Sequence, residues 1–151
     1  MLIQVLTTIA SIASVGFGVW HFFVPRAWHW YTYIDSGATE LVLAIQAINI
    51  FFSLSLVAFG LANLILIWSG KSNRFSILVL LSVSVILWAT RSVMQLVYPQ
   101  GSINPILQYG MLFAFLSVTA LYMASFVLTS LQKPVLHIAA TVEHQHRFRR
   151  I

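Results

Sequence analysis

The sequence predicts an all-α, membrane-embedded four-helix bundle, and three observations support this fold class. The 151-residue chain is 60% hydrophobic and only 7% charged, whereas soluble domains carry roughly 25% charged residues. Four apolar segments reach the roughly 20 residues that a helix needs to cross a hydrocarbon core of about 30 Å. Basic and aromatic residues gather at the borders of these segments, as is typical of membrane proteins.

The expected helices form one domain, residues 1–133, and cover residues 2–24, 40–68, 75–97 and 106–131. Pro25 is expected to end the first helix, because proline removes a backbone donor and clashes with the preceding turn. Ser72-Asn73 is expected to cap the third, and Asn104-Pro105 supplies an N-cap and a first-turn proline for the fourth. The second helix exceeds a perpendicular span, so it either tilts or begins in the head-group region.

Orientation follows from the basic residues in the short loops, because cytoplasmic loops of membrane proteins are enriched in Lys and Arg. One side carries six such residues and the other carries two. The six are Lys71, Arg74, Lys133, Arg147, Arg149 and Arg150, and the two are Arg26 and Arg91. We therefore expect both termini in the cytoplasm (N-in/C-in), in a bacterial-type cytoplasmic membrane. The basic tail, residues 134–151, would then adhere to anionic lipid, or alternatively dock a cytoplasmic partner.

Composition also excludes several classes of function. The chain has no cysteine, which excludes disulfides, covalent haem attachment and iron–sulfur ligation. The net charge is +5, but the basic residues border the apolar runs and form no basic face. The expected partner is therefore the lipid bilayer, with no nucleic acid.

Polar and small residues form stripes along the expected helices. The spacing of three or four residues predicts a left-handed bundle with the stripes at the helix contacts. The first stripe is Thr7, Ser11, Ser14, Gly18 and His21, and the second is Gln46, Asn49, Ser53, Leu56, Gly60 and Asn63. Weaker patterns place Ser84, Trp88, Arg91 and Gln95 on one face of the third helix, and Gly110, Ala114, Ser117 and Ala124 on the contact face of the fourth.

The outer ends of all four expected helices carry polar residues at a similar depth. Ionisable groups in a span are costly unless paired, so they indicate a functional site. We expect an ion pair between Glu40 and Arg91, with His21 as a hydrogen-bond partner or proton carrier. The alternative is that these groups only reach the interface. The candidate ligand pocket comprises His21, Glu40, Gln46, Asn49, Arg91, Gln95, Gln108 and Tyr109, where the amides serve either as structural contacts or as pocket lining.

The sequence gives little support for a haem, di-iron or zinc site. Only His21 lies within an expected span, which argues against a bis-histidine haem. The three acids of the whole chain are too few for a carboxylate-bridged di-iron site. A zinc site from His21, His29 and Glu40 would match no known spacing. The sequence therefore predicts no metal and identifies no cofactor or catalytic residue.

The stretch Gly-Val-Trp-His-Phe-Phe-Val-Pro (18–25), followed by an interfacial loop and Glu40-Leu41, resembles the DoxX-like group of four-helix membrane proteins. The resemblance covers the order and spacing of the helices but few residues. It implies a four-helix bundle and, for some relatives, an accessory role beside quinone-linked redox enzymes. Only His21, Pro25 and Glu40 are matched to residues of the DoxX-like pattern.

Three functions remain open from the sequence. The first is an accessory subunit or binder of a small amphipathic ligand, in a larger membrane complex or a homo-oligomer. The second is a membrane enzyme acting on a lipid or quinone-like substrate, with His21 as acid or base and Arg91 holding an anionic group. The third is a small oligomeric transporter.

The topology can be tested by single cysteines at Ser72 and Ser102 of this cysteine-free chain. A membrane-impermeant maleimide should label the cysteine at 102 in intact cells and the cysteine at 72 only after the membrane is opened. Labelling of both positions from the same side would contradict the orientation.

Overall fold

The computed structural model describes residues 1–35, 37–101 and 104–132, and the expected tail 134–151 lies outside them. Every regular element of the described residues is helical. The elements are α1 (Leu2–His21), α2 (Val24–Ala27), η1 (Trp30–Tyr33), α3 (Thr39–Trp68), α4 (Arg74–Val97) and α5 (Pro105–Leu131). Helices α1, α3, α4 and α5 are long and apolar enough to cross a membrane. The all-α four-helix prediction is confirmed.

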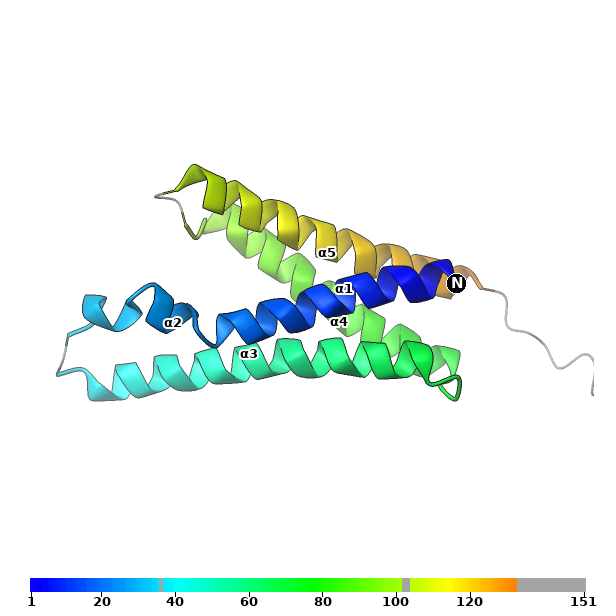
Figure 1. The fold of residues 1–151 in the computed structure, drawn as a ribbon, viewed down its shortest axis with the longest axis horizontal. Coiled ribbons are helices and arrows are strands. Elements are labelled where there is room, and N and C mark those ends of the chain that lie inside the picture. Colours follow the sequence, from blue (N-terminus) through cyan, green and yellow to red (C-terminus); the bar gives the residue numbers. More distant parts are fainter. Residues whose placement is uncertain (36, 102–103, 133–151) are drawn as a thin grey trace, which may run out of the picture.

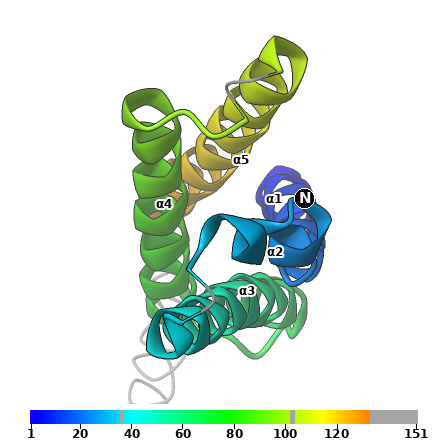
Figure 2. The same cartoon turned by 90° about the vertical axis from the view of Figure 1, so that its left-hand side faces the viewer.

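The long helices form two antiparallel pairs, α1 with α3 and α4 with α5 (Figure 1). Helix α1 also packs along α5, whereas α4 crosses α3 obliquely. The pairs meet at the end that holds Met1 and the α3–α4 turn, called here the terminal end. They diverge at the end that holds α2, η1 and the α4–α5 loop, called here the aromatic end (Figure 2).

Helix α1 ends at His21, so the expected helix 2–24 is too long. After a turn at Phe22 and Phe23, the chain begins the short helix α2, and Pro25 lies in its first turn. Proline is tolerated there because the first N–H groups of a helix have no intrahelical partner. Pro25 therefore starts a helix instead of ending one. His29, with φ of 50°, then turns the chain into η1.

Helix α3 extends well beyond the end of its partner α1. At 1.5 Å per residue, the 20 residues of α1 are about 30 Å long, which matches a hydrocarbon core, and the 30 residues of α3 are about 45 Å long. His21, at the end of α1, contacts Ser53 of α3. The first ten residues of α3 thus continue past α1, towards α2 and η1 (Figure 1).

Two expected helix caps are confirmed. The Asn73 side-chain oxygen accepts a hydrogen bond from the Ser76 N–H at 2.7 Å and caps α4. The Asn104 oxygen accepts from Ile106 N–H at 3.0 Å, with Pro105 in the first turn of α5. Each cap satisfies donors that the helix itself leaves free.

The stripes of α1 and α3 are the contact between these helices. Thr7, Ser11, Ser14 and Gly18 are buried on α1, and Asn49, Ser53, Leu56, Gly60 and Asn63 are buried on α3. A Cβ atom at Gly18 would lie 2.9 Å from the Ser53 carbonyl oxygen, and one at Gly60 would lie 2.9 Å from the Ser11 carbonyl oxygen. The two backbones thus approach as closely as glycine allows.

A buried hydrogen-bond network joins the pairs. Trp88 of α4 donates its indole N–H to the Ser14 hydroxyl of α1 at 2.9 Å. The Tyr122 hydroxyl of α5 lies 3.0 Å from the same Ser14 oxygen. Asn63 of α3 donates to the Ser84 hydroxyl of α4 at 2.8 Å. All four long helices therefore take part in side-chain hydrogen bonds across the core.

The expected contact face of the last helix is wrong. The buried residues of α5 are Phe115, Val118, Tyr122, Ser125 and Thr129. Gly110 and Ala114 are exposed, and a Cβ atom at Gly110 would meet nothing within 4 Å. The reason is complementarity: α1 already presents small residues, so α5 fills the space opposite them with large side chains such as Tyr122.

The glycine contacts give a stability prediction. Gly18→Leu and Gly60→Leu should each lower the free energy of unfolding in detergent by about 1–3 kcal/mol or more, because a larger side chain forces two backbones apart. Gly16→Leu is the matched control on α1, since a Cβ atom at Gly16 meets nothing within 4 Å; its effect should stay within about 0.5 kcal/mol. Equal losses at all three positions would contradict the observed faces.

Candidate functional site

A continuous cluster of aromatic rings lies where the two helix pairs begin to diverge. Phe17 of α1 contacts Phe115 of α5 edge-on, with ring centroids 5.1 Å apart, and Trp88 of α4 at 5.7 Å. His21 contacts Phe17 at 5.7 Å and Phe52 of α3 at 4.7 Å. Edge-to-face contacts at these separations are favourable beyond the area that they bury. The cluster draws on all four long helices.

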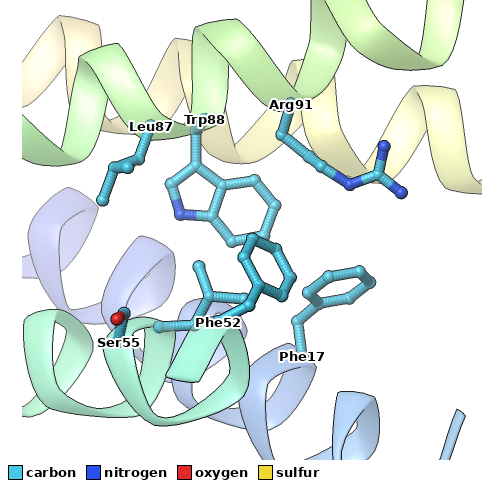
Figure 3. A pocket seen from close by; sticks show the side chains of 7 residues that line it. Phe17, Phe52, Ser55, Leu87, Trp88 and Arg91 are labelled. Atoms are coloured by element: carbon cyan, nitrogen blue, oxygen red, sulfur yellow. The ribbon is translucent and has the colours of Figure 1, made fainter. Parts of the chain in front are cut away.

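The cluster encloses a small cavity between α3 and α4, called here the aromatic slot (Figure 3). Trp88 and Arg91 reach down from α4 towards Phe52 and Phe17. The indole nitrogen of Trp88 bonds to Ser14, so the apolar part of its ring remains for the slot. The slot has a volume of about 40 Å³ and is lined by Phe17, Phe52, Ser55, Leu56, Leu87, Trp88 and Arg91.

Arg91 is a half-buried cation in this apolar setting. Its guanidinium carbon lies 4.4 Å from the centroid of the Phe115 ring, and its Nη2 donates to Gln100 Oε1 at 2.6 Å. A cation over an aromatic face is attracted by the ring quadrupole. Among the described residues no carboxylate neutralises this cation.

The expected ion pair between Glu40 and Arg91 is wrong. Glu40 is exposed in the first turn of α3, beyond the end of α1. Helices α3 and α4 diverge towards the aromatic end, so these two ends lie apart (Figure 2). Arg91 instead takes an amide oxygen and an aromatic face as partners.

Gln95 closes the α4–α5 loop and does not line the slot. It is 2% exposed, and its amide donates to the Gln100 carbonyl at 3.0 Å, while the Gln100 N–H donates back to Gln95 Oε1 at 3.4 Å. Gln108 contributes only its backbone carbonyl oxygen, which lies 3.5 Å from the Gln95 amide nitrogen. Tyr109 points outward and is 65% exposed. The structure thus separates these three residues from the slot.

His21 is fixed by α3. The Ser53 hydroxyl donates to the Asn49 carbonyl at 2.7 Å and lies 3.4 Å from His21 Nδ1. Since the hydroxyl proton of Ser53 is already engaged, the second bond requires a proton on Nδ1. In the neutral ring, Nε2 then carries the lone pair.

Gln46 and Asn49 line a different cavity, on the other face of the α1–α3 pair, called here the Arg26 hollow. Its volume is about 190 Å³, and its lining residues are Phe22, Pro25, Arg26, Tyr31, Gln46, Asn49 and Ile50. Asn49 is 6% exposed, and its Oδ1 has no hydrogen-bond partner within the described residues. Of the eight residues expected to line one pocket, Arg91 lines the aromatic slot, Gln46 and Asn49 line the Arg26 hollow, and the other five line neither.

Sequence reasoning missed the aromatic residues Phe17, Phe52 and Phe115. Phenylalanine in an apolar span looks the same whether it faces lipid or protein. The available signal was the position of Phe17, four residues before His21 and hence on the same helix face. As for metals, no group of three His, Cys, Asp or Glu residues that could hold an ion occurs among the residues described.

Neither the family models, nor the curated proteins, nor the solved structures compared with this chain give a match. The resemblance to the DoxX-like group therefore stays a prediction.

The contacts of Arg91 predict a coupling pattern. A double-mutant cycle of Arg91→Gln with Gln100→Ala should show a coupling energy of at least about 0.5 kcal/mol in detergent unfolding, because the residues are hydrogen-bonded. The matched cycle of Arg91→Gln with Glu40→Gln should be additive within about 0.3–0.5 kcal/mol. A larger coupling with Glu40 than with Gln100 would contradict the observed partners of Arg91.

Proposed function

We propose that this chain binds a single-chain amphipathic molecule, whose anionic head meets Arg91 and whose apolar chain enters the aromatic slot. The observation that carries the proposal is the half-buried Arg91 cation at the edge of an aromatic cavity, without a carboxylate partner among the described residues.

The charge of Arg91 favours an anionic head group. A guanidinium carries five N–H donors, and one bond to Gln100 together with the Phe115 face leaves several of them available. In surroundings of low dielectric, an arginine binds a carboxylate or phosphate through short, charge-assisted hydrogen bonds. Such a ligand would also neutralise a cation that is otherwise costly at this depth.

The size of the slot favours a narrow apolar body. A cavity of about 150 Å³ holds benzene, whereas the slot measures about 40 Å³. It therefore suits part of an alkyl chain better than a ring. Ser55 and Leu87, which line the slot, are both exposed on the surface of α3 and α4. A ligand would thus enter sideways, from the bilayer.

The orientation belongs to the same proposal. Lys71 and Arg74 lie at the terminal end, together with Met1, whereas Arg26 and Arg91 lie towards the aromatic end (Figure 1). The preference of basic loops for the cytoplasm supports N-in/C-in in a bacterial-type cytoplasmic membrane. The slot would then lie in the outer half of the bilayer.

The other hypotheses gain less support from the geometry. His21 does not line the slot, and Phe17 and Phe52, which do, both contact its ring. Acid–base chemistry by His21 on a ligand in the slot is therefore not favoured. An accessory role in a membrane complex is compatible with ligand binding and stays a prediction, as does transport by an oligomer.

Photolabelling tests the proposal. A diazirine-bearing fatty acid, added to the purified full chain in mild detergent, should label peptides that contain Phe17, Phe52 and Trp88. Ser55→Trp should cut this labelling severalfold by filling the slot, and Arg91→Gln should do so by removing the cation. Arg91→Gln should lower labelling about tenfold, the cost of one hydrogen bond to a charged group.

Leu54→Trp is the matched control, since Leu54 is 52% exposed on the same turn of α3 and does not line the slot. It should leave labelling unchanged. Labelling spread evenly over the lipid-facing residues of all four helices, or equal loss in Leu54→Trp and Ser55→Trp, would refute binding in the slot.

A further inference from the structure

We propose that Gln100 determines which head group the Arg91 site accepts. Its neutral amide holds the guanidinium in place and leaves the positive charge, with one pair of N–H donors, for an oxyanion. This inference rests on the proposed binding of an amphipathic ligand at Arg91. It adds a specificity-determining residue that does not line the aromatic slot.

Gln100 lies in the loop between α4 and α5, and both helices hold this loop in place. Gln95 of α4 is 2% exposed; its amide donates to the Gln100 carbonyl oxygen at 3.0 Å and accepts from the Gln100 N–H at 3.4 Å. Gly101, with φ of 74°, lies against α5, because a Cβ atom there would be 3.0 Å from Met111 Cε and 3.1 Å from Leu107 Cδ2. The backbone position from which the Gln100 side chain extends is therefore fixed.

The Gln100 side chain reaches back along α4 to Arg91. Arg91 and Gln95 are four residues apart on α4 and therefore lie on the same face of this helix. Arg91 Nη2 donates to Gln100 Oε1 at 2.6 Å, and the Phe115 ring lies against the guanidinium, with its centroid 4.4 Å from the guanidinium carbon. Gln100 and Phe115 together restrain both the position and the plane of the guanidinium.

The guanidinium of Arg91 retains one complete edge for a ligand. An arginine can bind an oxyanion through two parallel N–H groups, either Nε–H with one hydrogen of Nη2 or Nη1–H with the other. Gln100 uses one hydrogen of Nη2, so one of these two edges stays complete. Phe115 covers a face of the guanidinium plane and not an edge. One carboxylate or one phosphate can therefore bind through two charge-assisted hydrogen bonds.

The neutrality of residue 100 keeps this edge open to an anion. A glutamate has nearly the shape of a glutamine, but its carboxylate would pair with Arg91 and repel a second anion. A carboxamide also carries N–H donors beside its oxygen, whereas a carboxylate has only acceptors. Glutamine at this position thus favours an anionic head group, and glutamate would favour a neutral or cationic one.

Photolabelling of the purified full chain in mild detergent tests the role of Gln100. The diazirine probes have one chain length and four head groups: carboxylate, phosphate, alcohol and amine. The unmodified chain should prefer the two anionic probes, and the stronger of these identifies the head group. Gln100→Glu should lower labelling by both anionic probes about tenfold, the effect of one hydrogen bond to a charged group, and should raise labelling by the amine. Gln100→Ala should weaken anionic labelling less and keep the order of the probes, because it removes the orienting contact but adds no charge.

Gln108→Glu is the matched control, because it adds the same charge near the start of α5, where Gln108 contributes only its backbone carbonyl oxygen to the Gln95 contacts. This variant should keep the order of the probes. Gln100 is exposed, so its variants should fold, and unfolding in detergent checks this. Equal losses in Gln100→Ala and Gln100→Glu, or in Gln108→Glu and Gln100→Glu, would overturn the role of Gln100 but leave the proposed function in place. Equal labelling of the unmodified chain by the carboxylate and alcohol probes would overturn both.

Discussion

The hydroxyl of Ser14 is the point on which the rest of the bundle depends. It accepts a hydrogen bond from the Trp88 indole N–H at 2.9 Å, and it lies 3.0 Å from both the Tyr122 hydroxyl and the Ala10 carbonyl oxygen. In an apolar interior, a polar group that misses its partner is left without compensation. Each interhelical hydrogen bond contributes only about 0.6 kcal/mol, but together they fix where α4 and α5 lie against α1. The aromatic slot follows from this arrangement, because the bond to Ser14 turns the apolar part of Trp88 towards the slot.

The close contact of α1 and α3 holds this pair together, but it does not hold the two helix pairs together at the aromatic end. Gly18 and Gly60 bring these two backbones together, while α4 crosses α3 obliquely and packs instead along α5. The pairs therefore separate at the aromatic end (Figure 2), and the aromatic slot lies between α3 and α4. Both cavities described above adjoin the α1–α3 pair, and the polar residues that border them lie close to the ends of the spans. This is where a protein can meet amphipathic molecules without burying uncompensated charge.

Much of the fold could be predicted because the relevant signals are local. Helix length, the caps at Asn73 and Asn104, and the stripes on α1 and α3 depend on residues within a few turns of each other. The face of α5 was wrong for a different reason. Small residues mark a contact face only if the neighbouring helix does not already supply them. The sequence of α5 alone does not reveal that this helix packs against the face of α1 that carries small residues. The predicted ion pair between Glu40 and Arg91 was wrong because opposite charge and similar depth do not determine the distance between two helices that diverge.

By itself, the sequence determined that this chain is an all-α bundle of four helices long and apolar enough to cross a membrane, and which faces of α1 and α3 meet. The tertiary structure decided that Pro25 begins a short helix, that Arg91 lies on Phe115, and that Gln95 closes a loop instead of lining a pocket. It also decided that Arg91 lines one cavity, that Gln46 and Asn49 line another, and that the other residues of the expected pocket line neither. The physical reason is that hydropathy and spacing act along one helix, whereas a cavity depends on the crossing angles of several helices. Those angles are fixed by a few buried contacts between residues far apart in the chain, above all those of Ser14 with Trp88 and Tyr122.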